Sequence, residues 1–292
     1  MPATFGPFRL LATLATVLAS GGALAQDAPR FSFAVLADIQ YADKDAAGRR
    51  AYRDSLRKLE AAAAAIDAAN PAFVVQLGDL IDDGGFESLG RVLPLLDRIR
   101  APKRHVIGNH DLSIPRQDLL RRLGLERGWH DFEHGGWRFI VLDGMHVSAA
   151  TPGGRRMLAA LERAGRKNAA AWNGGIGEEQ KAWLRGVLES AARDGEPAVV
   201  FCHFPVLEAS STAAHLLWNH EEIVSILEGA PAVVAWFNGH DHRGGYARRN
   251  GIHYVTFPGM VESGAANSWT IVDVYPDRSE EHTSELQSLS HL

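Results

Sequence analysis

The 292-residue sequence predicts a single α/β domain in which two sheets pack together and helices cover their outer faces. Three observations lead to this fold class. Strand-like and helix-like segments alternate through the first half of the chain, and strands, hairpins and helices are mixed in the second half. Polar residues follow several strands, at the positions where ligands collect in open α/β sheets.

The first half begins with a strand ending at Asp38 and continues with an alanine-rich helix over residues 51–70, which Asn70 and Pro71 terminate. A second strand covers residues 72–79, and "GRVLPLLDRIR" is helical. "KRHVIGNHD" is a short strand that runs into a loop. Residues 129–144 give two strand-like runs around Gly135 and Gly136, which is typical of a hairpin.

The second half begins with an amphipathic helix over residues 177–195, closed by Gly195. "PAVVFCHFP" is a strand, residues 213–230 form a helix, and "PAVVAWFNGHDH" is the next strand. Asn250 and Gly251 are a preferred hairpin turn, and "WTIVDVY" is the last strand. The elements therefore predict strands that end repeatedly in polar motifs.

The two ends of the chain do not fit this domain. Residues 1–25 combine Arg9, a short apolar run and a small-residue cleavage site, which predicts a signal peptide and export to a bacterial periplasm; an uncleaved anchor or a mis-assigned start is the alternative. The apolar run is too short to predict a stable membrane anchor. Residues 278–292 are polar and lack periodicity, and they resemble a translated sequencing-library adapter, so we expect a non-native tail rather than a natural disordered one. The expected domain is 26–277.

Bulk composition restricts the function. A net charge of −5 argues against a nucleic-acid binder, which needs a basic surface, so an anionic substrate requires local cations. The single cysteine, Cys202, excludes an intramolecular disulfide and is expected to be a small buried hydrophobe. The sequence does not predict an oligomeric state.

Five strand ends carry side chains that bind metals. In an extended chain, alternate residues point the same way, so Asp38 and Gln40 are expected to face one centre. Carboxylates, imidazoles and amide oxygens suit Mn, Fe or Zn rather than copper or an iron–sulfur cluster. Glycine precedes three of these motifs, where the backbone must turn sharply. The residues are Asp38 with Gln40, Asp79, Asn109 with His110, His203, and His240 with His242.

In this order the motifs resemble the signature of the calcineurin-like metallophosphoesterases, which implies a four-layer α-β-β-α sandwich of the metallo-dependent phosphatase type. The resemblance implies two divalent metal ions bridged by Asp79. It assigns Asp38, Gln40 and His242 to the first ion, and Asn109, His203 and His240 to the second. It makes His110 a catalytic residue that faces the phosphate and helps the leaving group, with Asp111 orienting it. Two such cations generate hydroxide at neutral pH and stabilise both oxygens of an in-line displacement.

The stretches "ADIQYAD", "VVQLGDLID", "WNGGIGEEQKAWL" and "NGHDHRGGY" resemble one branch, the manganese-dependent ADP-ribose/CDP-alcohol diphosphatases. Gln40 replaces the histidine that most of the family has, and its harder amide oxygen favours Mn. The resemblance implies hydrolysis of the pyrophosphate in ADP-ribose or in CDP-alcohols such as CDP-choline. A phosphomonoesterase or cyclic-nucleotide phosphodiesterase with the same centre is the alternative, and a non-catalytic metal-binding scaffold is a third.

Candidate substrate contacts are basic or aromatic residues near these motifs. Arg49, Arg50 and Arg53 are candidates for neutralising a distal phosphate, although an arginine-rich helix start is more often a solvated face. Arg243 and Tyr246 follow the last metal motif and are the other candidates, with an ordinary loop as the alternative. "WNGGIGEEQ" is either a backbone approach to a nucleotide or a helix entry.

Overall fold

The structure is a computed structural model that describes residues 29–263 and 269–275. The expected signal peptide, residues 1–25, and the expected tail, residues 278–292, lie outside the described residues. Within the described ranges, none of the helices is long and apolar enough to span a bilayer.

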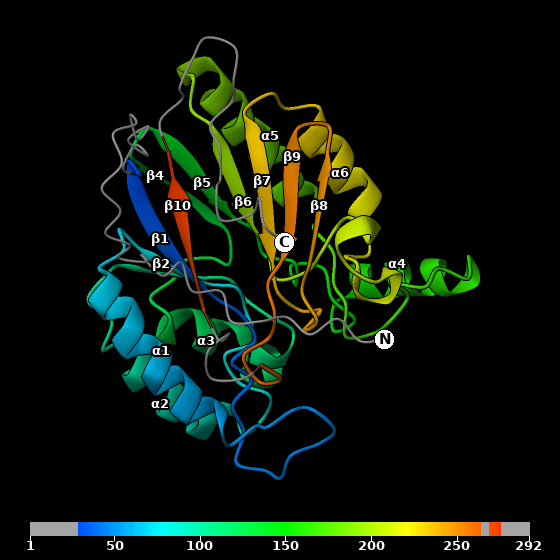
Figure 1. Ribbon diagram of the computed structural model, residues 1–292. Helices are drawn as coiled ribbons and strands as arrows, with labels where there is room; N and C mark the ends of the chain where they lie inside the picture. The colour runs from blue at the N-terminus through cyan, green and yellow to red at the C-terminus, as the bar shows by residue number, and fades with distance from the viewer. Residues whose placement is uncertain (1–28, 264–268, 276–292) are drawn as a thin grey trace, which may run out of the picture.

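The first sheet has four strands in the order β10-β1-β2-β3. Its strands are β1 (Phe31–Leu36), β2 (Val74–Gln76), β3 (Lys103–His105) and β10 (Thr270–Val274). The first three are parallel, and β10 is antiparallel to β1. The outer face of this sheet packs on α1 (Ser55–Ala69) and α2 (Gly85–Leu96), as Figure 1 shows at the lower left.

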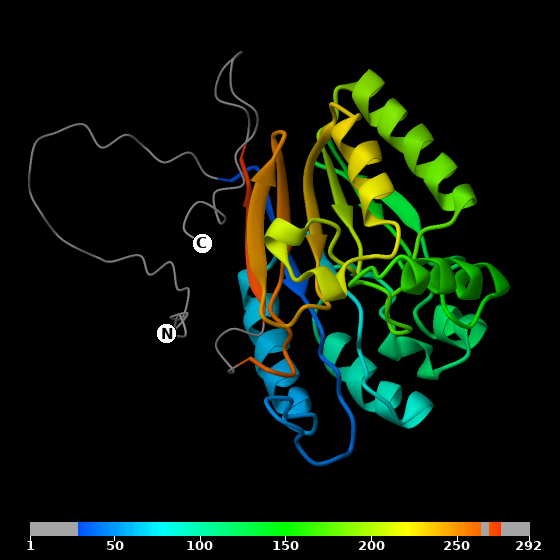
Figure 2. The same cartoon turned by 90° about the vertical axis from the view of Figure 1, so that its right-hand side faces the viewer.

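The second sheet has six strands in the order β4-β5-β6-β7-β9-β8, and its four central strands are parallel. The strands are β4 (His130–His134), β5 (Trp137–Val141), β6 (Ala198–Phe201), β7 (Val233–Asn238), β8 (Gly245–Arg249) and β9 (Ile252–Thr256). Its outer face packs on α5 (Glu178–Asp194) and α6 (His220–Glu228) (Figure 1). The order α-β-β-α is the predicted sandwich, seen from the side in Figure 2.

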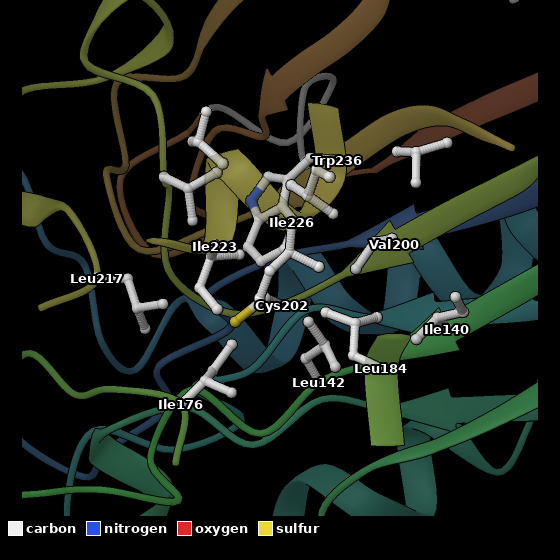
Figure 3. Close-up of a cluster of buried hydrophobic side chains, with 14 of the residues drawn as sticks. Ile140, Leu142, Ile176, Leu184, Val200, Cys202, Leu217, Ile223, Ile226 and Trp236 are labelled. Carbon is white, nitrogen blue, oxygen red and sulfur yellow. The ribbon is translucent and has the colours of Figure 1, made fainter. Parts of the chain in front are cut away.

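Strand alternation divides the core into three layers. Val199 and Phe201 of β6 point between the sheets, where they meet Phe33 and Val35 of β1. Val200 points the other way, toward the helices. Figure 3 shows this outer cluster, with Cys202 surrounded by apolar side chains from β5, β7 and α6. Burial raises the pKa of Cys202 to about 12, so the thiol is the inert hydrophobe that was predicted.

Both predicted hairpins are confirmed, with left-handed backbone at Gly135 and Gly136 and at Asn250 and Gly251. The predicted helix over residues 213–230 is wrong in its first part, because α6 begins only at His220. The backbone N–H groups of Leu217 and Trp218 donate to Pro205 and Gly174 instead of forming a helical turn.

The sequence pattern did not predict three further helical segments. They are η1 (His110–Ser113), α3 (Arg116–Arg122) and α4 (Pro152–Arg163). The local signal for α4 was a Thr151 cap before a proline: its hydroxyl accepts a hydrogen bond from the backbone N–H of Gly154 at 3.1 Å.

Candidate metal centre

The predicted ligands follow the carboxyl ends of parallel strands from both sheets. Asp38 comes after β1 and Asp79 after β2, while His203 and His240 come after β6 and β7. Because the two sheets pack face to face, these ends meet at one edge of the sandwich. All four side chains are buried.

The backbone at the centre is strained. Asp38, Gln40, Asp79 and His240 have φ values of 48°, 42°, 56° and 69°, a conformation that costs a non-glycine residue about 1–3 kcal/mol. The expectation that strand alternation aligns Asp38 and Gln40 is wrong, because β1 ends at Leu36 and both residues are left-handed. The surrounding fold stabilises this geometry at the site.

Glycines leave the space that the ligands occupy. A Cβ atom on Gly108 would lie 2.1 Å from Asp79 Oδ1, and one on Gly239 would lie 2.3 Å from Asp38 Oδ2. Both distances are far inside van der Waals contact. The predicted glycine requirement therefore has a steric cause in addition to any turn geometry.

Asp79 contacts both halves of the predicted ligand set. Its Oδ2 accepts a hydrogen bond from Gln40 Nε2 at 3.1 Å and lies 3.3 Å from His203 Nε2. On the Gln40 side, His242 Nε2 lies 3.4 Å from Asp38 Oδ1. Asp79 therefore lies between the two halves of the predicted ligand set.

The second half brings two ring nitrogens and an amide oxygen together. His203 Nδ1 donates to the Leu77 carbonyl at 2.8 Å, and His240 Nε2 donates to Asn173 Oδ1 at 3.0 Å. The other nitrogens of the two rings, His203 Nε2 and His240 Nδ1, are 3.1 Å apart. Asn109 Oδ1 also lies 3.1 Å from His203 Nε2. Nitrogen and oxygen atoms that converge in this way stabilise a positive charge between them, either a proton or a metal ion.

The pKa values of the three histidines show where the site stabilises positive charge. Burial lowers the pKa of His203, but the Asp79 charge and hydrogen bond raise it to about 9. Burial also lowers the pKa of His242, but the hydrogen bonds with Asp38 and Glu262 raise it to about 10. Burial and the neighbouring His203 hold the pKa of His240 well below its ordinary value. The site thus stabilises positive charge at selected positions.

The residues fit a divalent metal pair. Gln40 Oε1 is buried and has no hydrogen-bond partner among the described residues, although Gln40 Nε2 is bonded to Asp79. A buried carbonyl oxygen without a partner is costly unless a ligand such as a cation satisfies it. The donor set of Asp79, His203 and His240, with ligand atoms within 4.8 Å of one another, suits the same ions.

Outer residues that the sequence patterns missed fix the ring orientations. Asn173 Nδ2 donates to the Asn168 and Ala214 carbonyls at 3.0 and 2.8 Å, which directs its Oδ1 at His240. Glu262 Oε1 accepts from His242 Nδ1 at 3.0 Å. Such second partners set the tautomer and basicity of a ligating imidazole. Asn173 lies in the "WNGGIGEEQ" stretch, but the sequence did not indicate its contact with His240, and no motif marks Glu262.

The predicted role of Asp111 as the partner of His110 is corrected by the structure. The Asp111 carboxylate is fully buried and accepts the backbone N–H groups of Gly108 and Asp79, both at 2.9 Å, and of Leu80 at 2.7 Å. It therefore joins the two loops that carry the ligands. Burial and the Asp79 charge raise the pKa of Asp111 to about 6.

Asp82 is the residue that faces the His110 imidazole. His110 Nδ1 lies 3.1 Å from the Asp82 carbonyl oxygen and 3.3 Å from Asp82 Oδ1. Asp82 is in turn paired with Lys44, whose ammonium also contacts Asp83 at 2.7 Å. The His110 imidazole contacts Asp82 and remains partly exposed.

Comparison with known proteins agrees with this geometry. A family model described as calcineurin-like phosphoesterase matches residues 31–244. The chain is a calcineurin-like phosphoesterase. It is therefore a metal-dependent hydrolase, and the family fold binds a dimetal centre.

Similar proteins cover most of this phosphoesterase. A manganese-dependent ADP-ribose/CDP-alcohol diphosphatase from Arabidopsis thaliana is 31% identical, covering 86% of this chain and 93% of the relative. A protein of the same name from Xenopus tropicalis is 31% identical over 80% and 85% of the two chains. A crystal structure of a dimetal phosphatase from Danio rerio superposes with a TM-score of 0.78 at 27% identity, covering 85% of this chain and 94% of that one.

The three arginines predicted to contact substrate lie in different surroundings. Arg49 and Arg50 lie 3.5 and 3.3 Å from Glu262, which links them to the ligand His242. Arg53 instead donates to Asp43 and Asp45 at 2.6 Å on an exposed loop. Arg53 is therefore neutralised by local carboxylates, whereas the first two lie beside the metal centre.

The other two candidate substrate contacts, Arg243 and Tyr246, also differ in their surroundings. Arg243 Nε and Nη2 donate to the two Asp241 oxygens at 3.0 Å, and the side chain remains 57% exposed beside His242. Tyr246 lies on β8, with its hydroxyl 3.0 Å from His253 Nδ1. The structure thus holds Arg243 at the edge of the centre and directs Tyr246 toward β9.

Proposed function

We propose that this enzyme hydrolyses the pyrophosphate bond of ADP-ribose or of CDP-alcohols such as CDP-choline. ADP-ribose would give AMP and ribose 5-phosphate, and CDP-choline would give CMP and phosphocholine. The observation that carries the proposal is the unsatisfied Oε1 of Gln40 in the metal centre, at a position where a harder ligand favours Mn. The names of the similar diphosphatases support the same substrates and the same metal.

The ligands would hold two Mn ions, Asp38, Gln40 and His242 on one side and Asn109, His203 and His240 on the other, with Asp79 shared. Bound there, the ions would supply a nucleophile at neutral pH and neutralise developing charge on phosphate oxygens. Other residues of this chain would transfer a proton and bind the anionic groups of the substrate.

His110 is positioned to protonate the departing phosphate oxygen, because Asp82 holds its Nδ1 side. Arg243 is fixed by Asp241 with part of its guanidinium exposed, which suits an anionic group at the edge of the site. Arg49 and Arg50 suit a second anionic group on the Glu262 side. We also propose that the protein is exported to the periplasm, as its first 25 residues predict.

The test is a substrate comparison with the full chain loaded with Mn, using ADP-ribose, CDP-choline, cyclic AMP and p-nitrophenyl phosphate. We expect kcat/KM for the two pyrophosphates to exceed that for the monoester and the cyclic diester at least tenfold. Asp79→Asn is the control for a contaminating phosphatase, since it removes the shared ligand at nearly constant side-chain volume. Equal or faster turnover of p-nitrophenyl phosphate or cyclic AMP would overturn the proposal.

A further inference from the structure

An exposed indole stands beside the metal centre. Trp172 is 43% exposed, and Phe86 is the other large hydrophobic residue with comparable exposure in the described ranges. The Trp172 ring centroid lies 5.2 Å from that of the predicted ligand His240. An indole left in water loses the free energy that its burial would provide, so its position next to a ligand calls for a functional explanation.

The loop around Trp172 is fixed rather than free. The next residue, Asn173, donates to two carbonyls and accepts from His240, which ties this part of the loop to the centre. Trp172 is thereby held at a defined place relative to the metal ligands. A preorganised aromatic side chain binds with less entropy cost than a mobile one.

A second ring completes the surface. The His215 centroid lies 5.2 Å from Trp172 and 5.3 Å from His240, so the three rings are mutual neighbours. His215 Nδ1 donates to the Thr212 hydroxyl at 2.6 Å, and that hydroxyl donates to Asp241 at 3.1 Å. Trp172 and His215 thus form a part-exposed aromatic surface that adjoins the metal centre.

We propose that Trp172, with His215 at its side, is the surface on which the base of the nucleotide substrate stacks. The inference rests on the proposed function, since it places a nucleoside on one side of a pyrophosphate held in the metal centre. Stacking tolerates different bases, because each presents a π-face, and this surface would accept adenine and cytosine alike.

The test is binding of the two halves of each substrate to Mn-loaded full-length protein by isothermal titration calorimetry. AMP and CMP carry a base, whereas ribose 5-phosphate and phosphocholine do not. We expect Trp172→Ala to weaken AMP and CMP binding about 5- to 150-fold, the range of base–aromatic stacking, and Trp172→Phe to recover most of the loss. Binding of the two base-free phosphates should change less than about twofold.

Two controls separate stacking from damage to the centre. The Mn content of Trp172→Ala is measured, because the ring also packs on His240. Phe86→Ala removes an equally exposed aromatic side chain whose ring contact is with Arg122, and we expect it to leave nucleotide affinity unchanged.

Equal losses for all four phosphates, or no loss for AMP and CMP, would overturn the inference. A loss confined to phosphocholine would overturn it in favour of cation–π binding of the alcohol end. Failure of the stacking surface and failure of the proposed function give different results. If the wild type binds AMP through Trp172 but does not cleave ADP-ribose, the activity fails and the stacking surface stands; the reverse pattern rejects only the surface.

Discussion

Asp111→Asn tests whether the buried carboxylate holds the two ligand loops together or orients His110. The substitution keeps the size of the side chain but turns one oxygen into an N–H donor. One Asp111 oxygen accepts from Leu80 at 2.7 Å and the other from Gly108 and Asp79 at 2.9 Å. Whichever position the amide nitrogen takes, at least one buried backbone N–H faces a donor.

The expected cost follows from these bonds. A hydrogen bond to a charged acceptor contributes about 1.5–3 kcal/mol, and a buried donor left unsatisfied costs about 1–3 kcal/mol more. We therefore expect Asp111→Asn to lower the free energy of unfolding by about 2.5–6 kcal/mol, together with a loss of Mn affinity, because the affected loops carry Asp79 and Asn109. The assay is urea unfolding and Mn titration at pH 7.5, above the Asp111 pKa of about 6, so the wild-type carboxylate is ionised.

Asp118→Asn is the matched control, since Asp118 is a partly exposed aspartate paired with Arg121 on α3, and it should shift stability by less than about 0.5 kcal/mol. The reasoning would be refuted if Asp111→Asn kept the wild-type unfolding midpoint and Mn affinity while kcat alone fell. That pattern would return Asp111 to the role of partner of His110.

Three further perturbations address single contacts. Asp82→Asn should lower kcat about tenfold or more and shift its pH profile, with Mn content unchanged, because it removes the carboxylate charge 3.3 Å from His110 Nδ1 and leaves the backbone carbonyl contact in place; an unaltered profile would argue against this pair. Glu262→Gln should weaken Mn binding about 10- to 100-fold in a titration, because it removes the charge behind His242; wild-type affinity would show that this contact is dispensable. Burial lowers the pKa of His105 from 6.5 to about 4, so the unfolded chain binds the extra proton and stability falls as pH drops from 6.5 toward 4. The test is urea unfolding of the wild type and of His105→Leu at pH 7.5 and 4.5. Between these pH values, the free energy of unfolding should decrease by up to about 3 kcal/mol less in His105→Leu than in the wild type, and equal decreases would reject the assignment.

The residues that meet at the site could be predicted because each stands in a short local motif at a strand end. "GD" and "GNHD" identify their residues without knowledge of the three-dimensional contacts. The glycines within them mark places where a Cβ atom would lie 2.5 Å from His203 Nδ1 or 2.1 Å from Asp79 Oδ1. The hairpins were predictable for the same reason, since Asn250 and Gly251 adopt the left-handed backbone that such turns need.

The remaining parts of the site depend on contacts between distant segments. Asn173 reaches His240 from another loop, and Glu262 reaches His242 across 20 residues, so no spacing indicates either pair. The late start of α6 has the same origin, because Trp218 donates to Gly174 rather than to its own helix. Strand alternation failed at Gln40 because the metal centre imposes a left-handed backbone that the residue type does not reveal.

The central claim is that the polar residues at the strand ends hold two divalent cations and that Asp79 is shared between them. Its most direct test is the metal content of the full chain after Mn loading and desalting, measured by elemental analysis against protein concentration. We expect about two Mn ions per wild-type chain and fewer than one in Asp79→Asn, because loss of the shared carboxylate weakens both positions. A wild-type content of one ion or none, or two ions retained by Asp79→Asn, would contradict the account.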